Sequence, residues 1–226
     1  MAGNDIKLTT RDGEQLDCYI SDPGGSGPHP GILIVTAIFG TDDEMREAAD
    51  KWASEGYIVS VPDVFWRVHP GPTADMEVAF DRFGKFPHDQ GVLDIEDYIN
   101  DLRGRPECNG KIGVIGYCFG GRYAHLSAAR FGVQAAAAYH GTNIEKHLDE
   151  VPNVQCPVTW HFGEEDPVIP METVDKIREA FAGKPNAEVV VHPGCGHNFS
   201  MPQKDGYNEA AYKSSREATQ RIFAAM

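Results

Sequence analysis

The sequence predicts a single α/β domain, in which helices cover both faces of a mostly parallel, twisted β-sheet. The length of 226 residues suits one large domain better than two. Apolar residues make up 41% of the chain and charged residues 24%, which is typical of a globular protein with a substantial core. From about residue 30 onward, short apolar runs alternate with segments of helical spacing, and this alternation is typical of parallel strands joined by crossover helices. We therefore expect residues 1–226 to form one domain.

The N-terminal segment is expected to add an antiparallel hairpin to that sheet. Residues 6–9 and 15–20 have strand character, and between them lies an Asp-Gly turn at Asp12 and Gly13. Residues 21–28 are rich in Pro and Gly and form a loop. The hairpin therefore precedes the first parallel strand.

The parallel part begins with a continuous apolar run at 32–36, as expected for a strand buried on both faces. Residues 42–55 have helical spacing, with Thr41 or Asp42 as the N-cap and Gly56 as the stop. Later strands are expected at 57–62, 111–117, 135–139, 158–162 and 188–192, and later helices at 88–102, 119–131, 170–182 and 205–225. The segment 66–86, with its aromatics, prolines and glycines, is a candidate lid or insertion.

Charge and cysteine usage exclude several classes of protein. The net charge of −14 argues against binding to nucleic acid or to an anionic membrane surface, because both need clustered Lys and Arg. No apolar run is long enough to span a membrane, and the first residues lack the pattern of a secretory signal. The five cysteines are widely spaced, without a CxxC pair. These features together favour a reducing, cytoplasmic location.

The strongest chemical signal is the run Gly116-Tyr117-Cys118-Phe119-Gly120-Gly121, placed between an expected strand and an expected helix. Glycines two residues before and two residues after a nucleophile are typical of a nucleophile elbow, here with Cys118 in place of the commoner serine. Such a turn needs glycine because side chains at those positions would collide with the adjoining strand and helix. It also leaves the backbone N–H of Phe119 at a helix N-terminus, where it can stabilise an oxyanion.

Two further residues complete a candidate catalytic triad in the order nucleophile, acid, base. Asp166 lies in the loop after the expected strand at 158–162, and His197 lies after the last expected strand. The carboxyl ends of parallel strands meet at one edge of a sheet, so we expect Cys118, Asp166 and His197 to converge there. Cys118 would act as nucleophile, His197 as base and Asp166 as the group that orients the imidazole.

These motifs resemble the dienelactone hydrolase family, the branch of the α/β-hydrolases with a cysteine nucleophile. The matching stretches are Ile38-Phe39-Gly40, Val61-Pro62-Asp63 with Arg67, the elbow at 116–121, Gly163-Glu164-Glu165-Asp166 and Gly196-His197-Asn198-Phe199. The resemblance implies hydrolysis of a small lactone or carboxylic ester through a thioester acyl-enzyme, without cofactor or metal. It also implies that the backbone N–H of Ile38 is the second oxyanion donor.

The chain departs from the family pattern at two positions near the expected site. Members that open dienelactones usually carry a glutamate just before Ile-Phe-Gly, where this chain has Ala37. They also tend to carry an arginine four residues after the catalytic histidine, where this chain has Met201. The natural substrate therefore stays open, whereas the reaction class does not depend on either residue.

The substrate is expected to be a small molecule, and the protein a monomer or weak homodimer. Seven residues from separate parts of the chain are assigned to the candidate substrate pocket: Ala37, Phe39, Arg67, Tyr117, Arg122, His140 and Met201. The spacing His192-x-x-Cys195-x-His197 is similar to a metal motif, but one member is needed as the base, so no metal is expected. Two alternatives stay open, a ligand-binding protein of the same fold without turnover, and a thiol redox sensor that pairs Cys118 with Cys195.

Overall fold

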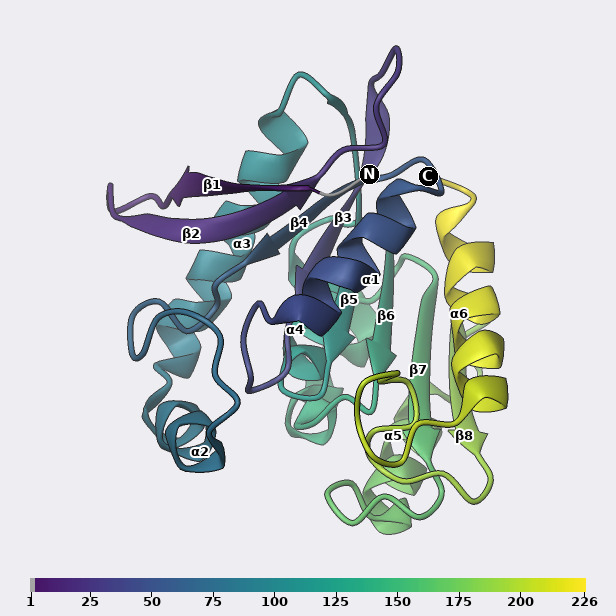
Figure 1. Cartoon of the computed structure of the whole chain (residues 1–226). Helices are drawn as coiled ribbons and strands as arrows, with labels where there is room; N and C mark the ends of the chain where they lie inside the picture. Colours follow the sequence, from purple (N-terminus) through teal and green to yellow (C-terminus); the bar gives the residue numbers. More distant parts are fainter. Residues whose placement is uncertain (1–2) are drawn as a thin grey trace. The chain divides into compact units, whose positions relative to one another are not determined.

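The computed structural model describes residues 3–226 and divides into two compact units, Met1–Gly113 and Val114–Met226. The division falls inside strand β5 (Cys108–Tyr117). Figure 1 labels the helices and strands of both units. The expectation of a single domain over residues 1–226 stays a prediction.

The first unit contains the expected N-terminal hairpin and the first parallel strand pair. Strand β1 (Asn4–Thr9) runs antiparallel to β2 (Gln15–Ser21), which in turn runs antiparallel to β4 (Ile58–Pro62). Strand β3 (His29–Val35) pairs with β4 in parallel, so the order in this unit is β1-β2-β4-β3. Most residues of β3 and all residues of β4 are buried, which is why the sequences of both strands are largely apolar without alternation.

Three helices accompany these strands. Helix α1 (Asp43–Ala53) packs on β4 and β2, and α3 (His88–Gly104) packs on β3 and β1 (Figure 1). The side chain of Asp42 accepts a hydrogen bond from the N–H of Met45, so Asp42 is the N-cap of α1. The segment expected to be a lid or insertion contains helix α2 (Met76–Lys85).

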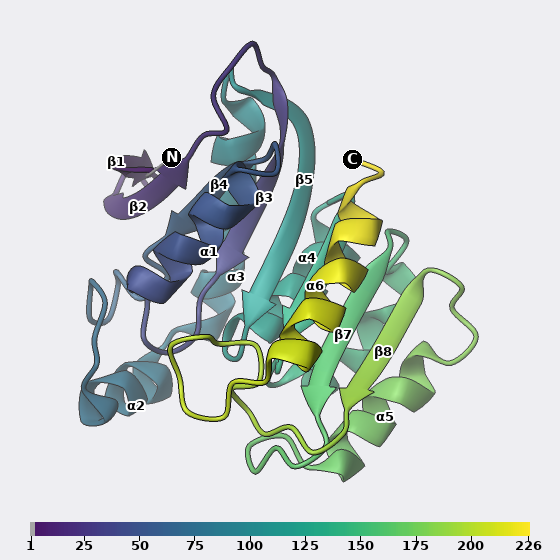
Figure 2. The same ribbon diagram turned by 45° about the vertical axis from the view of Figure 1, so that its right-hand side comes forward.

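The second unit is a parallel α/β arrangement. Strand β6 (Ala135–Tyr139) pairs with β7 (Val158–Gly163), and β7 pairs with β8 (Ala187–His192), all in parallel. The helices of this unit are α4 (Gly120–Arg130), α5 (Met171–Phe181) and α6 (Glu209–Phe223). Helix α6 lies on one face of β6 and β7, while α4 and α5 lie on the other (Figure 2). Helices thus cover both faces of these strands, as the alternation predicts.

Two segments differ from expectation. Residues Ile144–Asn153 (η1) form a 3₁₀ segment, which contains Pro152 and is interrupted by a non-helical backbone conformation at His147. The last helix was expected to start at residue 205 and instead starts at Glu209, with Asn208 as its N-cap. The reason is Gly206, whose φ of +92° is incompatible with a right-handed helix.

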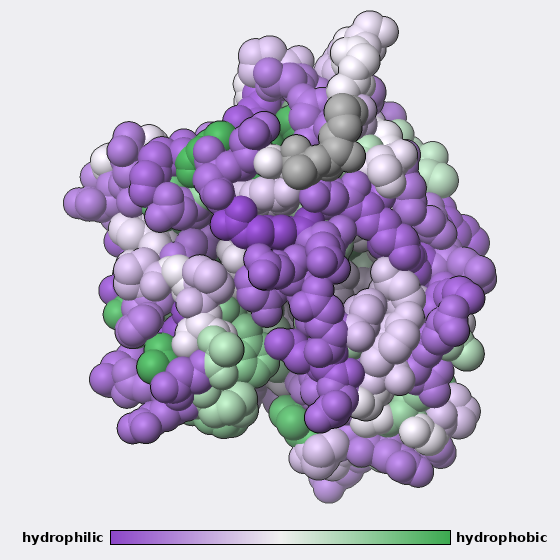
Figure 3. Space-filling view, in the orientation of Figure 1, coloured by the Kyte–Doolittle hydropathy of each residue, from purple (hydrophilic) through white to green (hydrophobic). Residues whose placement is uncertain are grey.

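The surface agrees with the acidic composition. The face seen in Figure 3 is mostly hydrophilic, and large exposed apolar side chains are few among the described residues. None of the helices over residues 3–226 combines the length and the apolar character that a membrane span requires.

Candidate active site

Cys118 lies at a sharp turn between β5 and α4. Its φ is +48°, a left-handed backbone conformation that non-glycine residues seldom adopt. The surrounding backbone holds the turn, because the N–H of Cys118 donates to the carbonyl of Tyr139 and its own carbonyl accepts from Gly121 and Thr142. A strained backbone conformation, held by hydrogen bonds at both the N–H and the carbonyl, is expected for the nucleophile of such an elbow.

The glycines around the elbow are required by close backbone approaches. A Cβ atom on Gly116 would lie 2.2 Å from the carbonyl oxygen of Gly120, and one on Gly121 would lie 2.2 Å from the Cα of Gly141. Real Cβ atoms do not come so close to backbone atoms. Gly121, three residues after Cys118, is thus as constrained as Gly116.

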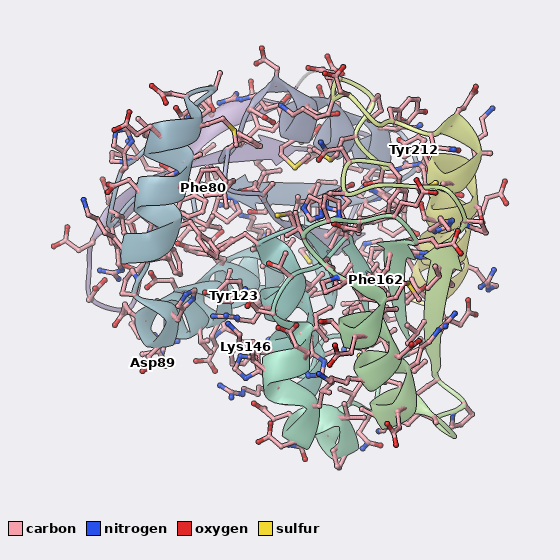
Figure 4. All side chains as sticks on the ribbon, turned by 90° about the horizontal axis from the view of Figure 1, so that it is seen from below. Phe80, Asp89, Tyr123, Lys146, Phe162 and Tyr212 are labelled. Carbon is pink, nitrogen blue, oxygen red and sulfur yellow. The ribbon has the colours of Figure 1, made fainter. Side chains whose placement is uncertain are left out.

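Phe119 is the residue that leads into α4. It takes the N-cap position, so its amide lies at the positive end of the helix dipole, as an oxyanion donor needs. Its ring packs 5.1 Å from that of Tyr123 on α4. Figure 4 shows the side chains from below, with Tyr123 of α4 and Phe162 of β7 labelled.

The acid and the base come from the loops after β7 and β8, and backbone bonds join these two loops. The N–H of Glu165 donates to the carbonyl of Cys195 at 2.9 Å, and the N–H of Glu164 donates to the carbonyl of His192 at 3.1 Å. A side chain on Gly163 would collide with the carbonyl of Cys195 at 2.3 Å. The Gly-x-x-Asp pattern is therefore explained by the packing of one loop against the other.

Asp166 orients His197. Their side chains meet at 2.7 Å between Oδ2 and Nδ1, and the Asp166 side chain is fully buried. The other carboxylate oxygen, Oδ1, accepts the backbone N–H groups of Val168 and Ile169. With both oxygens engaged, the carboxylate holds the ring with Nδ1 toward Asp166.

Cys118 and His197 interact directly. Burial lowers the pKa of His197, but hydrogen bonds to Asp166 and to Cys118, together with their charges, raise it to about 9. The imidazole therefore favours its protonated form beside the sulfur and the carboxylate. The three residues that the sequence proposes as a triad are brought together in the second unit.

A fourth residue, His140, joins this group. Sulfur and ring nitrogen atoms of Cys118, His140 and His197 lie within 4.8 Å of one another, and the two imidazole centroids are 4.7 Å apart. His140 is buried, and its φ is +41°. Burial first, and then the charge of His197, lowers the pKa of His140 well below its ordinary value, so the ring is neutral. Ser200 Oγ lies 3.1 Å from its Nε2.

The sequence places His161 near the end of an expected strand and His192 in the metal-like spacing, but it does not predict that their rings meet or that Ser200 meets His140. The Nδ1 atom of His161 lies 3.3 Å from Nε2 of His192, and Thr159 Oγ1 lies 2.9 Å from the other nitrogen of His161. A signal for the contact between Thr159 and His161 was present in the sequence, because these two polar residues occupy alternate positions of the otherwise apolar strand β7.

Other candidate pocket residues of the second unit are placed as follows. Tyr117 is buried and stacks on Tyr139, with ring centroids 5.0 Å apart. Arg122 is buried on α4, and Met201 is buried with its N–H donated to the carbonyl of Asn198. Their role in binding substrate stays a prediction.

The remaining candidates belong to the first unit. Ala37 is buried, and Ile38 and Phe39 are half-buried in the turn after β3, which the N–H of Gly40 closes by donating to the carbonyl of Ala37. The guanidinium of Arg82 donates to the carbonyl of Ile38 at 2.8 Å through Nε, and it also reaches the carbonyl of Gly71. This buried arginine therefore holds the turn that carries the proposed oxyanion donor.

Arg67 is engaged by acidic partners. Its guanidinium donates twice to Asp94, at 2.7 and 2.8 Å, and once to Asp12 at 2.8 Å, and it lies over the ring of Trp66. Two carboxylates thus offset its positive charge within the first unit.

Known proteins of similar sequence come from one hydrolase family. The family model of the dienelactone hydrolase family matches residues 16–226. The chain is 33% identical over 218 residues to a carboxymethylenebutenolidase of Pseudomonas putida, covering 94% of this chain and 92% of the relative. It is 28% identical over 230 residues to carboxymethylenebutenolidase 1 of Cupriavidus pinatubonensis, covering 99% and 97%.

Solved structures show the same fold. The crystal structure of a candidate dienelactone hydrolase from Klebsiella pneumoniae superposes with a TM-score of 0.89 at 27% identity, covering 99% of this chain and 98% of that one. A dienelactone hydrolase from Anabaena variabilis superposes with a TM-score of 0.73 at 15% identity, covering 100% and 99%, and shows the fold alone. The expected α/β-hydrolase fold and the resemblance are both confirmed, and the chain belongs to the dienelactone hydrolase family of carboxylic ester and lactone hydrolases.

Proposed function

We propose that this enzyme hydrolyses small lactones or carboxylic esters through a Cys118–His197–Asp166 triad and a thioester acyl-enzyme. The observation that carries the proposal is the position of His197, which is bonded through Nδ1 to buried Asp166 and interacts with Cys118 on its other side. This is the arrangement in which an imidazole takes a proton from a nucleophile and later returns it to a leaving group.

The first half of the reaction forms the acyl-enzyme. The sulfur of Cys118 attacks the carbonyl carbon, and the electron pair of the carbonyl moves to its oxygen. The amide of Phe119, at the N-terminus of α4, stabilises that oxyanion. When the tetrahedral intermediate collapses, the carbon–oxygen ester bond breaks and His197 protonates the leaving alkoxide. With a lactone, this alkoxide remains part of the acyl group.

The second half releases the acid. His197, now neutral, takes a proton from water while the water oxygen attacks the thioester carbonyl. The carbon–sulfur bond then breaks, and the electron pair returns to the sulfur of Cys118. Asp166 stabilises the imidazolium in both halves.

The alternatives raised by the sequence receive less support. A redox pair needs a second reactive thiol, and the pKa of the Cys195 thiol is raised by burial and by the nearby charge of Glu165. A raised pKa disfavours the reactive thiolate. We also propose that the enzyme acts in a reducing compartment such as the cytoplasm, and the described cysteines, which are all free, support this.

The test is a panel of small aryl esters and lactones, assayed with the wild type, Cys118→Ala and His197→Ala. We expect each substitution to lower kcat/KM at least about a thousandfold, since loss of the nucleophile or base removes roughly 4 kcal/mol of transition-state stabilisation. Cys156→Ala is the matched control, a half-buried cysteine of the same unit, and should keep wild-type turnover.

A direct readout accompanies the kinetics. An aryl ester should give a burst of one phenol per enzyme and an acyl adduct on the peptide that contains Cys118. Turnover by Cys118→Ala within about tenfold of the wild type would refute the mechanism.

A further inference from the structure

One nitrogen of the cluster formed by Cys118, His140 and His197 has no use in the hydrolytic mechanism. Among the described residues, Nδ1 of His140 is buried without a hydrogen-bond partner. A buried polar atom without a partner is costly, and beside a thiol and a second imidazole it points to a ligand. His140 lies at the end of β6, next to the proposed nucleophile and base.

The contact at the other ring nitrogen leaves this one for a ligand. Ser200 Oγ lies 3.1 Å from Nε2. In the tautomer in which Nε2 donates to that hydroxyl, Nδ1 carries the lone pair. The backbone of His140 is also fixed, because its N–H donates to the carbonyl of His161 at 2.8 Å.

The two imidazoles of the cluster share a feature of metal-binding histidines. Such a histidine usually has its remote ring nitrogen bonded to a carboxylate, hydroxyl or carbonyl, which sets the ring orientation. His197 has Asp166 at Nδ1, and His140 has Ser200 at Nε2. The remaining nitrogen of His197 meets Cys118, and a cation that binds there displaces the proton held by this pair, while Nδ1 of His140 has no partner.

The dimensions of the cluster suit a small soft cation. The candidate ligand atoms lie within 4.8 Å of one another. The ligands of one tetrahedral zinc ion are about 3.3 to 3.6 Å apart, given metal–ligand distances of about 2.0 to 2.3 Å. A bound ion would draw the three atoms together from the spacing that they have in its absence. Cys118 is partly exposed, so an ion can enter and a water molecule can fill the fourth position.

We propose that Cys118, His197 and His140 form a binding site for a soft divalent cation, Zn²⁺ in the first place, which blocks the enzyme. The cation is an inhibitor and not a cofactor, because it occupies the sulfur and the imidazole nitrogen that the hydrolytic steps use. The inhibition rests on the proposed function of Cys118 and His197, whereas the binding itself does not.

Binding is tested with Co²⁺ as a spectroscopic substitute for Zn²⁺. The wild type should show a sulfur-to-cobalt charge-transfer band that Zn²⁺ displaces, and Cys118→Ser should lack it. His140→Asn should weaken Co²⁺ binding at least tenfold; asparagine tolerates the positive φ of this position. His147→Asn, which removes a histidine of η1 in the same unit, is the control and should bind Co²⁺ as the wild type does.

Inhibition is tested by adding buffered free Zn²⁺ to the ester assay, with each variant compared to its own activity without metal. Zn²⁺ should inhibit the wild type, and Ser200→Ala should need about tenfold more Zn²⁺, because loss of the bond to Nε2 frees the His140 ring. Thermal unfolding of each variant establishes that it is folded.

A measurement on the wild type alone keeps the proposal testable should the His140 variant not fold. Zn²⁺ should slow alkylation of Cys118 by iodoacetamide at least tenfold, and it should not slow alkylation of Cys156. Absence of the cobalt band, undiminished metal binding by folded His140→Asn, or unprotected Cys118 would each overturn the proposal. A cobalt band and protection in a protein without esterase activity would uphold the site and refute only the proposed function.

Discussion

At the scale of single residues, the site depends on how Asp166 and Cys118 act on one imidazole. The pKa of His197 is raised to about 9 against the opposing effect of burial, by its hydrogen bonds to Asp166 and Cys118. The buried carboxylate is itself held by the N–H groups of Val168 and Ile169. His197 is therefore oriented by a fixed group, as a base that must reverse its role between the two half-reactions requires.

Asp166→Asn tests this orientation. The asparagine side chain keeps the size of aspartate but loses the charge, so we expect the pKa of His197 to fall and kcat to decrease by about 10² to 10⁴-fold. The pKa is measured by NMR titration of the His197 ring, and kcat by the ester assay. A variant with an unchanged His197 pKa and an unchanged kcat would contradict the assigned role.

At the scale of elements, the elbow is produced by backbone contacts between the start of α4 and the end of β6. Gly121 and Gly141 pass so closely that a Cβ atom on Gly121 would lie 2.2 Å from the Cα of Gly141. The carbonyl of Cys118 accepts two N–H groups across this contact. The conformation of Cys118 thus depends on the distance between two elements.

Gly121→Ala tests that dependence. We expect a loss of about 2 kcal/mol or more in the free energy of unfolding, because the added methyl group meets backbone that cannot rotate away. Activity per folded molecule should fall as well, since Cys118 would be displaced. Urea unfolding and the ester assay measure the two effects.

The matched control is Gly84→Ala on α2, where a Cβ atom meets nothing within 4 Å. Alanine in a helix is more stable than glycine by roughly 0.5 to 1 kcal/mol, so this variant should be neutral or slightly stabilised. Equal stability of the two variants would show that the contact at Gly121 is not restrictive.

At the scale of the whole molecule, charge influences which substrates approach. The net charge is −14, and Met201 stands where the family resemblance implies an arginine that holds a substrate carboxylate. The guanidinium of Arg67 is already bonded to Asp94 and Asp12. Long-range repulsion and the lack of a cation at position 201 both act against an anionic substrate.

We therefore expect substrates with a carboxylate beside the scissile bond to gain less than about tenfold over neutral analogues. A neutral aryl ester and its carboxylated counterpart are compared by kcat/KM at low and high salt, and salt should help the anion. A preference for the anion above about a hundredfold, roughly 2.7 kcal/mol, would show that the pocket holds a cation that pairs with it.

The buried histidines of the second unit give the molecule a characteristic response to acid. Burial first, then the charges of His192 and Arg221, lowers the pKa of His161 to about 3. In the unfolded chain a histidine titrates near 6.5. Between these two values the unfolded state binds the extra proton, so stability is fully present above about pH 6.5 and decreases as the pH falls toward 3.

His161→Gln isolates this contribution, because glutamine keeps a polar group beside Thr159 without titrating. Between about pH 6 and 4, the wild type should lose up to about 1.4 kcal/mol more per pH unit than the variant. Urea unfolding over this range measures both slopes. Parallel slopes would mean that His161 accepts a proton in the folded protein as readily as in the unfolded chain.

The sequence by itself determined the fold class, the elbow and the identity of the three residues that converge. Apolar runs and helical spacing are local signals, and they locate most strands and helices to within a few residues. The order of Cys118, Asp166 and His197 after successive strands then places them at one sheet edge, because parallel strands end on the same side. That inference needs only the common direction of the parallel strands, and it does not depend on which side chains are in contact.

Only the tertiary structure decided which other groups meet them. Three contacts join residues far apart in the chain: His140 with Ser200, His161 with His192, and Arg82 with the Ile38 carbonyl. The burial of His140 Nδ1 without a partner likewise depends on the surrounding packing. Whether such side chains touch depends on strand register and on the path of each loop, which residue spacing does not encode. A neutral buried histidine and an exposed one look alike in sequence, because the difference lies in the packing around them.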